Sequence, residues 1–402
     1  MRRLAALTFS LVGLAVPSGA AAAMIDDVVA VATKYGGGPL TVRTLAIVSL
    51  AMFDAANAVE RRYQPYIAPP PPPAGTDAEQ AAVGAGCAAL AAVRAQQADA
   101  IRKDCHAIGG ERISDAATAS RRYGESIGNA HAEARRNDGI GAPNAWRPAT
   151  TPEAYVPTTL PVGFDSASAR PFALRSPSQF RAAPPPALSS ERWARDFNEV
   201  RTMGAHDGSL RSAEQTATAL FFASQGPQQF LDSIAPLPMA AQGSATDRAR
   251  YYALVYMALF DASVAVFDTK YTYNFWRPLT AIRNGDHDDN DATPRDPVWT
   301  SLIDTPMHPE YPCAHCVNSA AFATVAFSFV GEGQPMVMRS AALPGQPPTT
   351  RTFRNARDLA AQVEDARVFG GVHYRNSTEV GTAMGTAVGE HVVATQLRPV
   401  AP

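Results

Sequence analysis

The chain has 402 residues, of which 46% are hydrophobic and 18% are charged, so it can bury the core of one large domain or two moderate ones. Its formal net charge of −2 excludes a broad basic surface for nucleic acid and an acidic tail. Any chemistry that depends on charge therefore has to come from a local cluster, and nucleic acid is not expected as a partner.

The N-terminal residues have the pattern of a secretory signal. "MRR" precedes the apolar stretch "LAALTFSLVGLAV" and the small residues "PSGAAAA", which offer cleavage near Ala22 or Ala23. This pattern predicts a signal peptide over residues 1–23 and a periplasmic or secreted mature protein. An uncleaved anchor and a start at Met24 are the alternatives. No later run reaches the roughly 18 uninterrupted apolar residues of a membrane span, so no transmembrane segment is expected.

Two segments of the chain repeat each other. "RTLAIVSLAMFDAANAVERRYQPY" from Arg43 and "RYYALVYMALFDASVAVFDTKYTY" from Arg250 align without a gap and share "FDA", "AV" and the closing Tyr66 and Tyr273. "GESIGNAHAEARRNDG" near residue 124 and "GTAMGTAVGEHVVATQL" near residue 381 both place glycines four apart. Chance similarity between amphipathic helices is the alternative, but a polar aspartate shared in one register argues against it. The repeat therefore favours duplication and two related helical bundles.

Helical periodicity predicts helices over 40–60, 77–104, 112–137, 190–203, 211–224, 246–268, 315–330, 354–369 and 378–396. We find no convincing strand framework. The segment 151–189 is rich in proline and serine, which favours an extended connector. The predicted organisation is an all-α protein with an N-terminal bundle over 24–150, this connector, and a C-terminal bundle over 190–402.

Four cysteines could form disulfides in an exported protein, but the sequence does not give their connectivity. Cys87 and Cys105 lie in or beside an alanine-rich helical run, where buried free cysteine is the ordinary outcome. Cys313 and Cys316 belong to "HPEYPCAHC". A zinc site there would need a fourth ligand, whereas a thiol redox pair or a disulfide remains an alternative.

Three segments of the C-terminal half carry residues suited to binding an anion. "KYTYNFWRP" places Lys270 and Arg277 seven residues apart, which on one helix is the same face. In "YPCAHCVNS" a helix is predicted to begin after Pro312, so that His315 lies at an N-terminus whose free N–H groups attract anions. "ARVFGGVHYRNS" places Arg367 at the end of a helix, before a glycine turn.

The order and spacing of these segments resemble the three-part signature of the type-2 phosphatidic acid phosphatase and vanadium haloperoxidase superfamily. In the first segment six residues separate Lys270 from Arg277, which precedes a proline. In the second, Pro312 and His315 form the pattern Pro-x-x-His before a helix. In the third, five residues separate Arg367 from His373. The context "FWRPLTAIR" and the proline-rich connector are similar to the bacterial vanadium chloroperoxidase-like branch. The resemblance implies two duplicated helical bundles, with one oxyanion site in the second.

This resemblance also implies roles for individual residues. Vanadate, or phosphate as part of a substrate, would be bound by Lys270, Arg277, Cys313, Ala314 and Arg367. His373 would be the ligand of vanadium, or the nucleophile toward phosphorus. His315 would act as acid and base on the opposite oxygen.

The sequence departs from the family pattern at two places. The usual Pro-Ser-Gly-His is Pro312-Cys313-Ala314-His315, so a thiol replaces a hydroxyl and a methyl group is added. The aspartate that usually follows the second histidine by four residues is replaced by Ser377, which we expect to cap the last helix.

The predicted function is that of an exported vanadium-dependent haloperoxidase that oxidises halide with hydrogen peroxide. The alternatives are an exported acid phosphatase that cleaves phosphomonoesters through a phosphohistidine, and a non-catalytic or thiol-redox relative. A homodimer is a possible assembly. The acidic loop "GDHDDND" at 285–291 lacks the pattern of a calcium-binding EF-hand and is expected to be a solvated surface loop.

Overall fold

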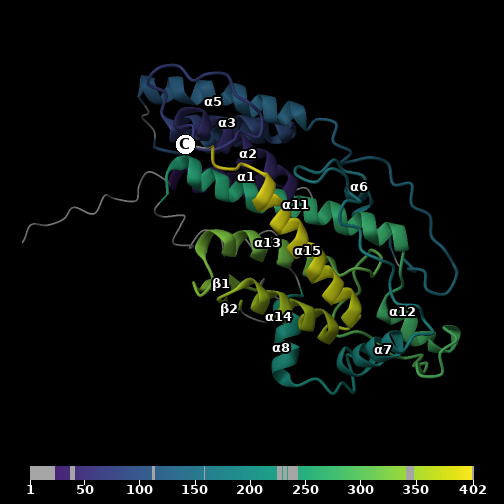
Figure 1. Cartoon of the computed structure of the whole chain (residues 1–402). Coiled ribbons are helices and arrows are strands. Elements are labelled where there is room, and N and C mark those ends of the chain that lie inside the picture. Colours follow the sequence, from purple (N-terminus) through teal and green to yellow (C-terminus); the bar gives the residue numbers. More distant parts are fainter. Residues whose placement is uncertain are drawn as a thin grey trace, which may run out of the picture.

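The computed structural model describes residues 23–36, 41–110, 114–157, 159–223, 243–340 and 348–400, together with residues 229 and 233. Except for Ala23, the predicted signal peptide lies outside these residues. Helices dominate the described chain (Figure 1), which confirms the all-α prediction. The exception is a short antiparallel hairpin of β1 (Met336–Arg339) and β2 (Thr350–Phe353), in which Met336 pairs with Phe353.

The helices of the N-terminal half and the connector are α1 (Ala23–Gly36), α2 (Thr41–Glu60), α3 (Ala78–Val93), α4 (Ala98–Ala107), α5 (Asp115–Ala134) and α6 (Phe164–Ala167). Those of the C-terminal half are α7 (Glu191–Met203), α8 (Ala213–Phe221), α11 (Ala245–Tyr273), α12 (Pro278–Arg283), α13 (Ala314–Val330), α14 (Ala356–Phe369) and α15 (Arg375–Thr395). The helix predicted over 77–104 is divided, because Arg94 leaves helical geometry and a 3-10 turn over Ala95–Gln97 joins α3 to α4.

The two repeated segments form α2 and α11, which pack against each other at the centre of the molecule (Figure 1). Asp54 and Asp261, the aspartates of the two "FDA" sequences, are both fully buried. Asp54 accepts the backbone N–H groups of Tyr66 and Ile67 at 2.8 and 2.7 Å. Asp261 likewise accepts three backbone N–H groups of the segment 172–174, at 2.7 to 2.9 Å. Each aspartate therefore anchors an extended segment, and this explains why both repeats keep it.

Helices α2 and α11 are long and apolar enough to cross a membrane by length and composition. The shares of their most apolar windows that lie inside the protein are 78% and 83%. The buried core helices of a bundle can also be long and apolar enough to meet this criterion. The sequence analysis did not identify α2 and α11 as meeting it.

Glycines four residues apart bring helices into close contact in both halves. A Cβ atom at Gly124 of α5 would lie 1.9 Å from the carbonyl oxygen of Ala81 on α3. A Cβ atom at Gly385 of α15 would lie 2.1 Å from the carbonyl oxygen of Val317 on α13. The predicted glycine spacing thus has one physical cause in both bundles, which is the approach of two helix backbones.

We expect Gly385→Ala to lower the free energy of unfolding by about 1–3 kcal/mol, because the added methyl group overpacks the contact of α15 with α13. Urea denaturation followed by circular dichroism measures this change. Glu390→Ala is the control, since Glu390 is exposed on the same helix. Equal midpoints for Gly385→Ala and the native protein would show that the two helices can separate without cost.

The expectation of free cysteines at 87 and 105 is wrong. Cys87 on α3 and Cys105 on α4 form a disulfide, with their Cα atoms 6.0 Å apart. The sequence pattern predicts one continuous helix, which would hold Cys87 and Cys105 far apart. The chain instead breaks at Arg94, and α4 turns back so that the two cysteines meet.

Candidate oxyanion site

Lys270 lies in the last turn of α11 and is fully buried. Its Nζ atom donates hydrogen bonds to the carbonyl oxygens of Pro309 and Glu310, both at 2.8 Å. The helix ends at Tyr273, because Asn274 adopts a left-handed conformation with φ of 49°. Arg277 therefore does not lie on the same helix face as Lys270, and that prediction is wrong.

Arg277 is the N-cap residue of α12 and connects the second and third sequence segments. Its Nε atom donates to the carbonyl oxygen of His308 at 3.0 Å, and one terminal nitrogen donates to Nδ1 of the same histidine at 3.0 Å. The other terminal nitrogen donates to the carbonyl oxygen of Val372 at 2.8 Å and lies 3.1 Å from Nε2 of His373. The turn after α11 thus brings Arg277 to His373.

The predicted helix of the second segment begins as expected. Helix α13 begins at Ala314, and the sulfur of Cys313 caps it by accepting the N–H group of Cys316 at 3.2 Å. Cys313 therefore takes the capping role that serine commonly has. Its own N–H group donates to the carbonyl oxygen of Ser377 at 3.1 Å, which ties α13 to α15.

Cys313 and Cys316 are free and fully buried, with their sulfur atoms 2.6 Å apart. In the described part of the chain, no group of three or more His, Cys, Asp or Glu side chains could hold a metal ion. The zinc alternative for "PCAHC" therefore has no support in the structure.

The third segment contributes Arg367, in the last turn of α14, and His373. Arg367 is 1% exposed, and one of its terminal nitrogens donates to the carbonyl oxygen of Phe222 at 3.3 Å. Gly371, with φ of 76°, lets the chain turn where a Cβ atom would lie 2.4 Å from the carbonyl oxygen of Gly204. The glycine turn therefore has the role that the sequence suggested, which is a close backbone approach.

Ser377 does not cap the last helix. Helix α15 begins at Arg375, and its N-cap residue Tyr374 makes no capping bond with its side chain. The Ser377 hydroxyl instead lies 3.4 Å from Nδ1 of His373. The same Nδ1 atom is 2.8 Å from a carboxylate oxygen of Glu310.

The three cations are buried with a single carboxylate among the described residues, that of Glu310, acting on Lys270 and Arg277. Lys270, Arg277 and Arg367 are each at most 1% exposed, and within the described ranges none of them forms an ion pair. Burial and the neighbouring Arg277 hold the pKa of Lys270 well below its ordinary value. Burial lowers the pKa of Arg277 to about 10. A cluster of this kind is costly until an anion compensates it.

The two histidines share this positive environment. Burial, and then the neighbouring Arg367, Arg277 and Lys270, hold the pKa of His315 well below its ordinary value. Burial and the same three cations do so for the pKa of His373. Both imidazole rings are therefore neutral in the protein without a bound anion. Each of the three cations acts on both imidazole rings, so the five side chains lie in one cluster.

Two buried nitrogen atoms of the predicted site residues lack partners in the part of the chain that the structure describes, and so does Oε2 of the neighbouring Glu310. Nε2 of His315 and Nε of Arg367 have no hydrogen-bond partner among the described residues. Unsatisfied buried polar groups are rare in folded proteins and usually indicate a missing ligand or water. An oxyanion offers several acceptor oxygens, so the donor set present here fits vanadate or phosphate.

Sequence reasoning missed two members of the cluster, Glu310 and His308. Both belong to "HPEYPCAHC", in which the sequence pattern points only to the cysteines and His315. A charged glutamate between proline and tyrosine gives no sign of burial, yet Glu310 is fully buried. His308 accepts from Arg277 and contacts Phe267 edge to face, with ring centres 5.3 Å apart.

The acidic loop is not simply solvated. Asp288 is buried and accepts the indole N–H group of Trp193 at 2.7 Å. Trp193 in turn contacts Tyr374, with ring centres 4.9 Å apart. The loop therefore supports the aromatic wall beside His373.

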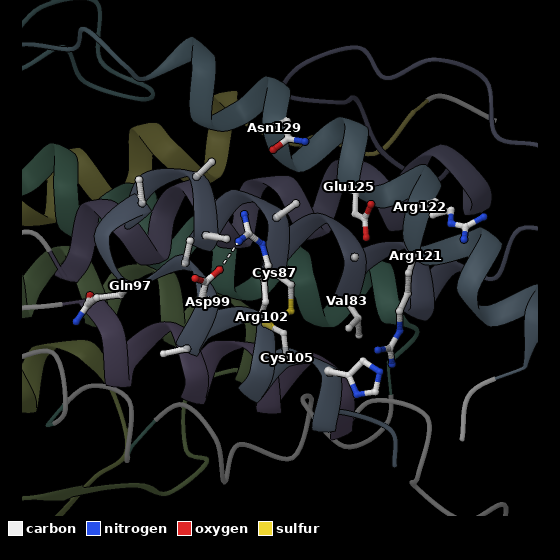
Figure 2. A pocket seen from close by; sticks show the side chains of 18 of the residues that line it. Val83, Cys87, Gln97, Asp99, Arg102, Cys105, Arg121, Arg122, Glu125 and Asn129 are labelled. Atoms are coloured by element: carbon white, nitrogen blue, oxygen red, sulfur yellow. Dashed lines mark hydrogen bonds and ion pairs between the residues drawn. A yellow bond between two sulfur atoms is a disulfide. The ribbon is translucent and has the colours of Figure 1, made fainter. Parts of the chain in front are cut away.

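A cavity of about 990 Å³ lies elsewhere, among α3, α4 and α5 of the N-terminal bundle (Figure 2). Figure 2 shows the Arg102–Asp99 ion pair and the Cys87–Cys105 disulfide among its lining side chains. None of the candidate oxyanion residues lines it. In the first repeat Tyr63 takes the position of Lys270, which agrees with a site in the second half only.

The match to a known family concerns the C-terminal half of the chain. Residues 250–401 match the family model described as the VCPO second helical-bundle domain. This part of the chain, which carries the candidate oxyanion residues, is therefore similar to that domain.

Individual relatives give further detail. The vanadium chloroperoxidase of Curvularia inaequalis is 29% identical over 189 residues, which are 40% of this chain and 30% of that protein. The matched segment thus spans less than a third of that relative's length. The structure of a bacterial vanadium-dependent iodoperoxidase has a TM-score of 0.75 and 22% identity, covering 94% of this chain and 96% of that one. A holo bacterial vanadium-dependent chloroperoxidase has a TM-score of 0.70 and 17% identity, covering 89% and 94%. These two structures share the fold.

Proposed function

We propose that this protein is an exported vanadate-dependent haloperoxidase that uses hydrogen peroxide to oxidise a halide. The observation that carries the proposal is the set of three buried cations that form no ion pair with a described residue, Lys270, Arg277 and Arg367. Their charges match a small oxyanion, and the vanadium-dependent relatives favour vanadate over phosphate. Export is inferred from the pattern of residues 1–23.

Within this proposal the cations bind and orient the anion. Arg277 and Arg367 can each offer more than one N–H group, and Lys270 adds a point charge. The N–H groups of Ala314 and His315 lie in the first turn of α13, where a helix leaves its donors unpaired. The anion would raise the pKa of Lys270, because an opposite charge favours the ionised form.

The two histidines would have different tasks. His373 offers the lone pair of Nε2, because Arg277 can only donate to that atom. Vanadate bound there would supply a Lewis acid that activates hydrogen peroxide toward halide. His315 would hold and transfer the proton, since its Nε2 atom is buried, neutral and free of other partners.

Assays on purified protein test the proposal. We expect oxidation of iodide or bromide that requires both vanadate and hydrogen peroxide, and that phosphate inhibits in competition with vanadate. Hydrolysis of p-nitrophenyl phosphate without halide oxidation would replace the proposal by the acid phosphatase acting through phosphorylated His373. Binding of neither anion would indicate a non-catalytic relative.

A further inference from the structure

Glu310 lies directly behind His373, on the side of the ring away from Arg277. One carboxylate oxygen is 2.8 Å from Nδ1 of His373 and accepts the backbone N–H group of Tyr374 at 3.1 Å. Glu310 and His373 are 0% and 1% exposed, respectively. A buried carboxylate in this position holds an imidazole ring in one orientation.

The partners of the ring assign its tautomer. The guanidinium group of Arg277 has only donors, so Nε2 of His373 must accept. A neutral imidazole whose Nε2 atom accepts carries its hydrogen on Nδ1, so Nδ1 donates to the carboxylate of Glu310. The lone pair at Nε2 therefore points toward Arg277 and the other cations.

Glu310 also connects the other segments of the site. Its carbonyl oxygen accepts from Lys270 at 2.8 Å, and its N–H group donates to the carbonyl oxygen of Phe275 at 2.9 Å. Lys270 and His373 are thus placed by the same residue, which lies five positions before His315.

We propose that Glu310 positions His373 and takes over the role of the carboxylate that the family pattern places at residue 377. This proposal rests on the proposed function only where it takes His373 to be the residue that binds vanadate. The Ser377 hydroxyl lies 3.4 Å from Nδ1 of His373, at the sequence position where the family pattern has an aspartate. Glu310 reaches the same Nδ1 atom from the segment before α13. The carboxylate has moved from α15 to the turn before α13.

This exchange predicts that the effect of Ser377→Asp depends on residue 310. In the native protein a second carboxylate would face the one Nδ1–H group that Glu310 already occupies, and two like charges would be buried together. In Glu310→Gln the same aspartate would supply the missing charge.

The experiment compares native protein, Glu310→Gln, Ser377→Asp and the double variant, without vanadate. Isothermal titration with inorganic phosphate measures anion affinity. Glu310→Gln should weaken it by about 10–100-fold, the usual effect of losing such a carboxylate. In the native protein, Ser377→Asp should weaken phosphate binding. In the Glu310→Gln variant, the same substitution should strengthen phosphate binding by at least about tenfold. Ser377→Ala is the matched control, because it removes the hydroxyl without adding charge and should not restore binding.

A second readout does not depend on any anion. Nitrogen NMR of labelled protein reports which ring nitrogen of His373 carries the hydrogen. The native protein should show the Nδ1–H form, Glu310→Gln a mixture, and the double variant the Nδ1–H form again. Tighter phosphate binding by Ser377→Asp alone, or an unchanged tautomer in Glu310→Gln, would overturn the proposal. If Glu310→Gln does not fold, Ser377→Asp alone still decides. If no protein binds phosphate or vanadate while the tautomers behave as expected, the proposed function fails and the positioning role stands.

Discussion

Replacing His373 by alanine is expected to abolish halide oxidation and to weaken vanadate binding by at least about tenfold, or 1.4 kcal/mol. The reason is that the variant loses the lone pair of Nε2, which faces Arg277 at 3.1 Å. His315→Ala should instead leave the affinity for vanadate nearly unchanged and reduce turnover by about 10²–10⁴-fold, the usual contribution of a proton-transferring side chain. Titration calorimetry and a steady-state assay separate the two effects.

His206→Ala is the control for these variants, because the side chain of His206 is 59% exposed. It should change neither quantity. Normal turnover in His315→Ala would require another residue to transfer the proton, and His308 would be examined first because it contacts Arg277.

The second large effect concerns the two arginines, which the structure distinguishes. Arg277 satisfies three acceptors besides His373, whereas Nε of Arg367 has no partner in the described part of the chain. Arg277→Met and Arg367→Met should each weaken phosphate binding by about 10-fold or more, since a hydrogen bond to a charged group contributes about 1.5–3 kcal/mol. Titration calorimetry measures both.

Stability without an anion should change in opposite directions in these two variants. Arg277→Met strands buried acceptors at His308 and Val372, so its melting temperature should fall. Arg367→Met removes a buried charge that lacks a carboxylate partner, so its melting temperature should rise. Phosphate should stabilise both variants less than it stabilises the native protein. A fall in both melting temperatures would show that Arg367 is compensated within the protein.

The fold class could be predicted because helical periodicity, the glycine spacing and the repeated "FDA" all result from local packing. The structure adds the reason for the repeat, because Asp54 and Asp261 each accept backbone N–H groups of another segment. The break at Arg94 and the Cys87–Cys105 disulfide could not be predicted, because an alanine-rich run fits one long helix as well as two.

Only those residues of the candidate site that belong to the three spaced motifs could be predicted from the sequence. The spacing predicts that Lys270 and Arg277 bind one anion, and this stays a prediction, whereas the helix argument for them was wrong because Asn274 ends α11. Glu310 could not be found, because its contact with His373 joins residues 63 apart in sequence and depends on the tertiary fold. The sequence pattern therefore shows Ser377 in place of the aspartate but not the carboxylate of Glu310 that lies 2.8 Å from Nδ1 of His373.

A crystal structure of the protein soaked with vanadate tests the central claim most directly. Our account predicts vanadium density at Nε2 of His373, with oxygen atoms within hydrogen-bonding distance of Lys270, Arg277 and Arg367. Vanadate bound only in the cavity among α3, α4 and α5, or no vanadium density in crystals whose His373 site is accessible, would contradict it.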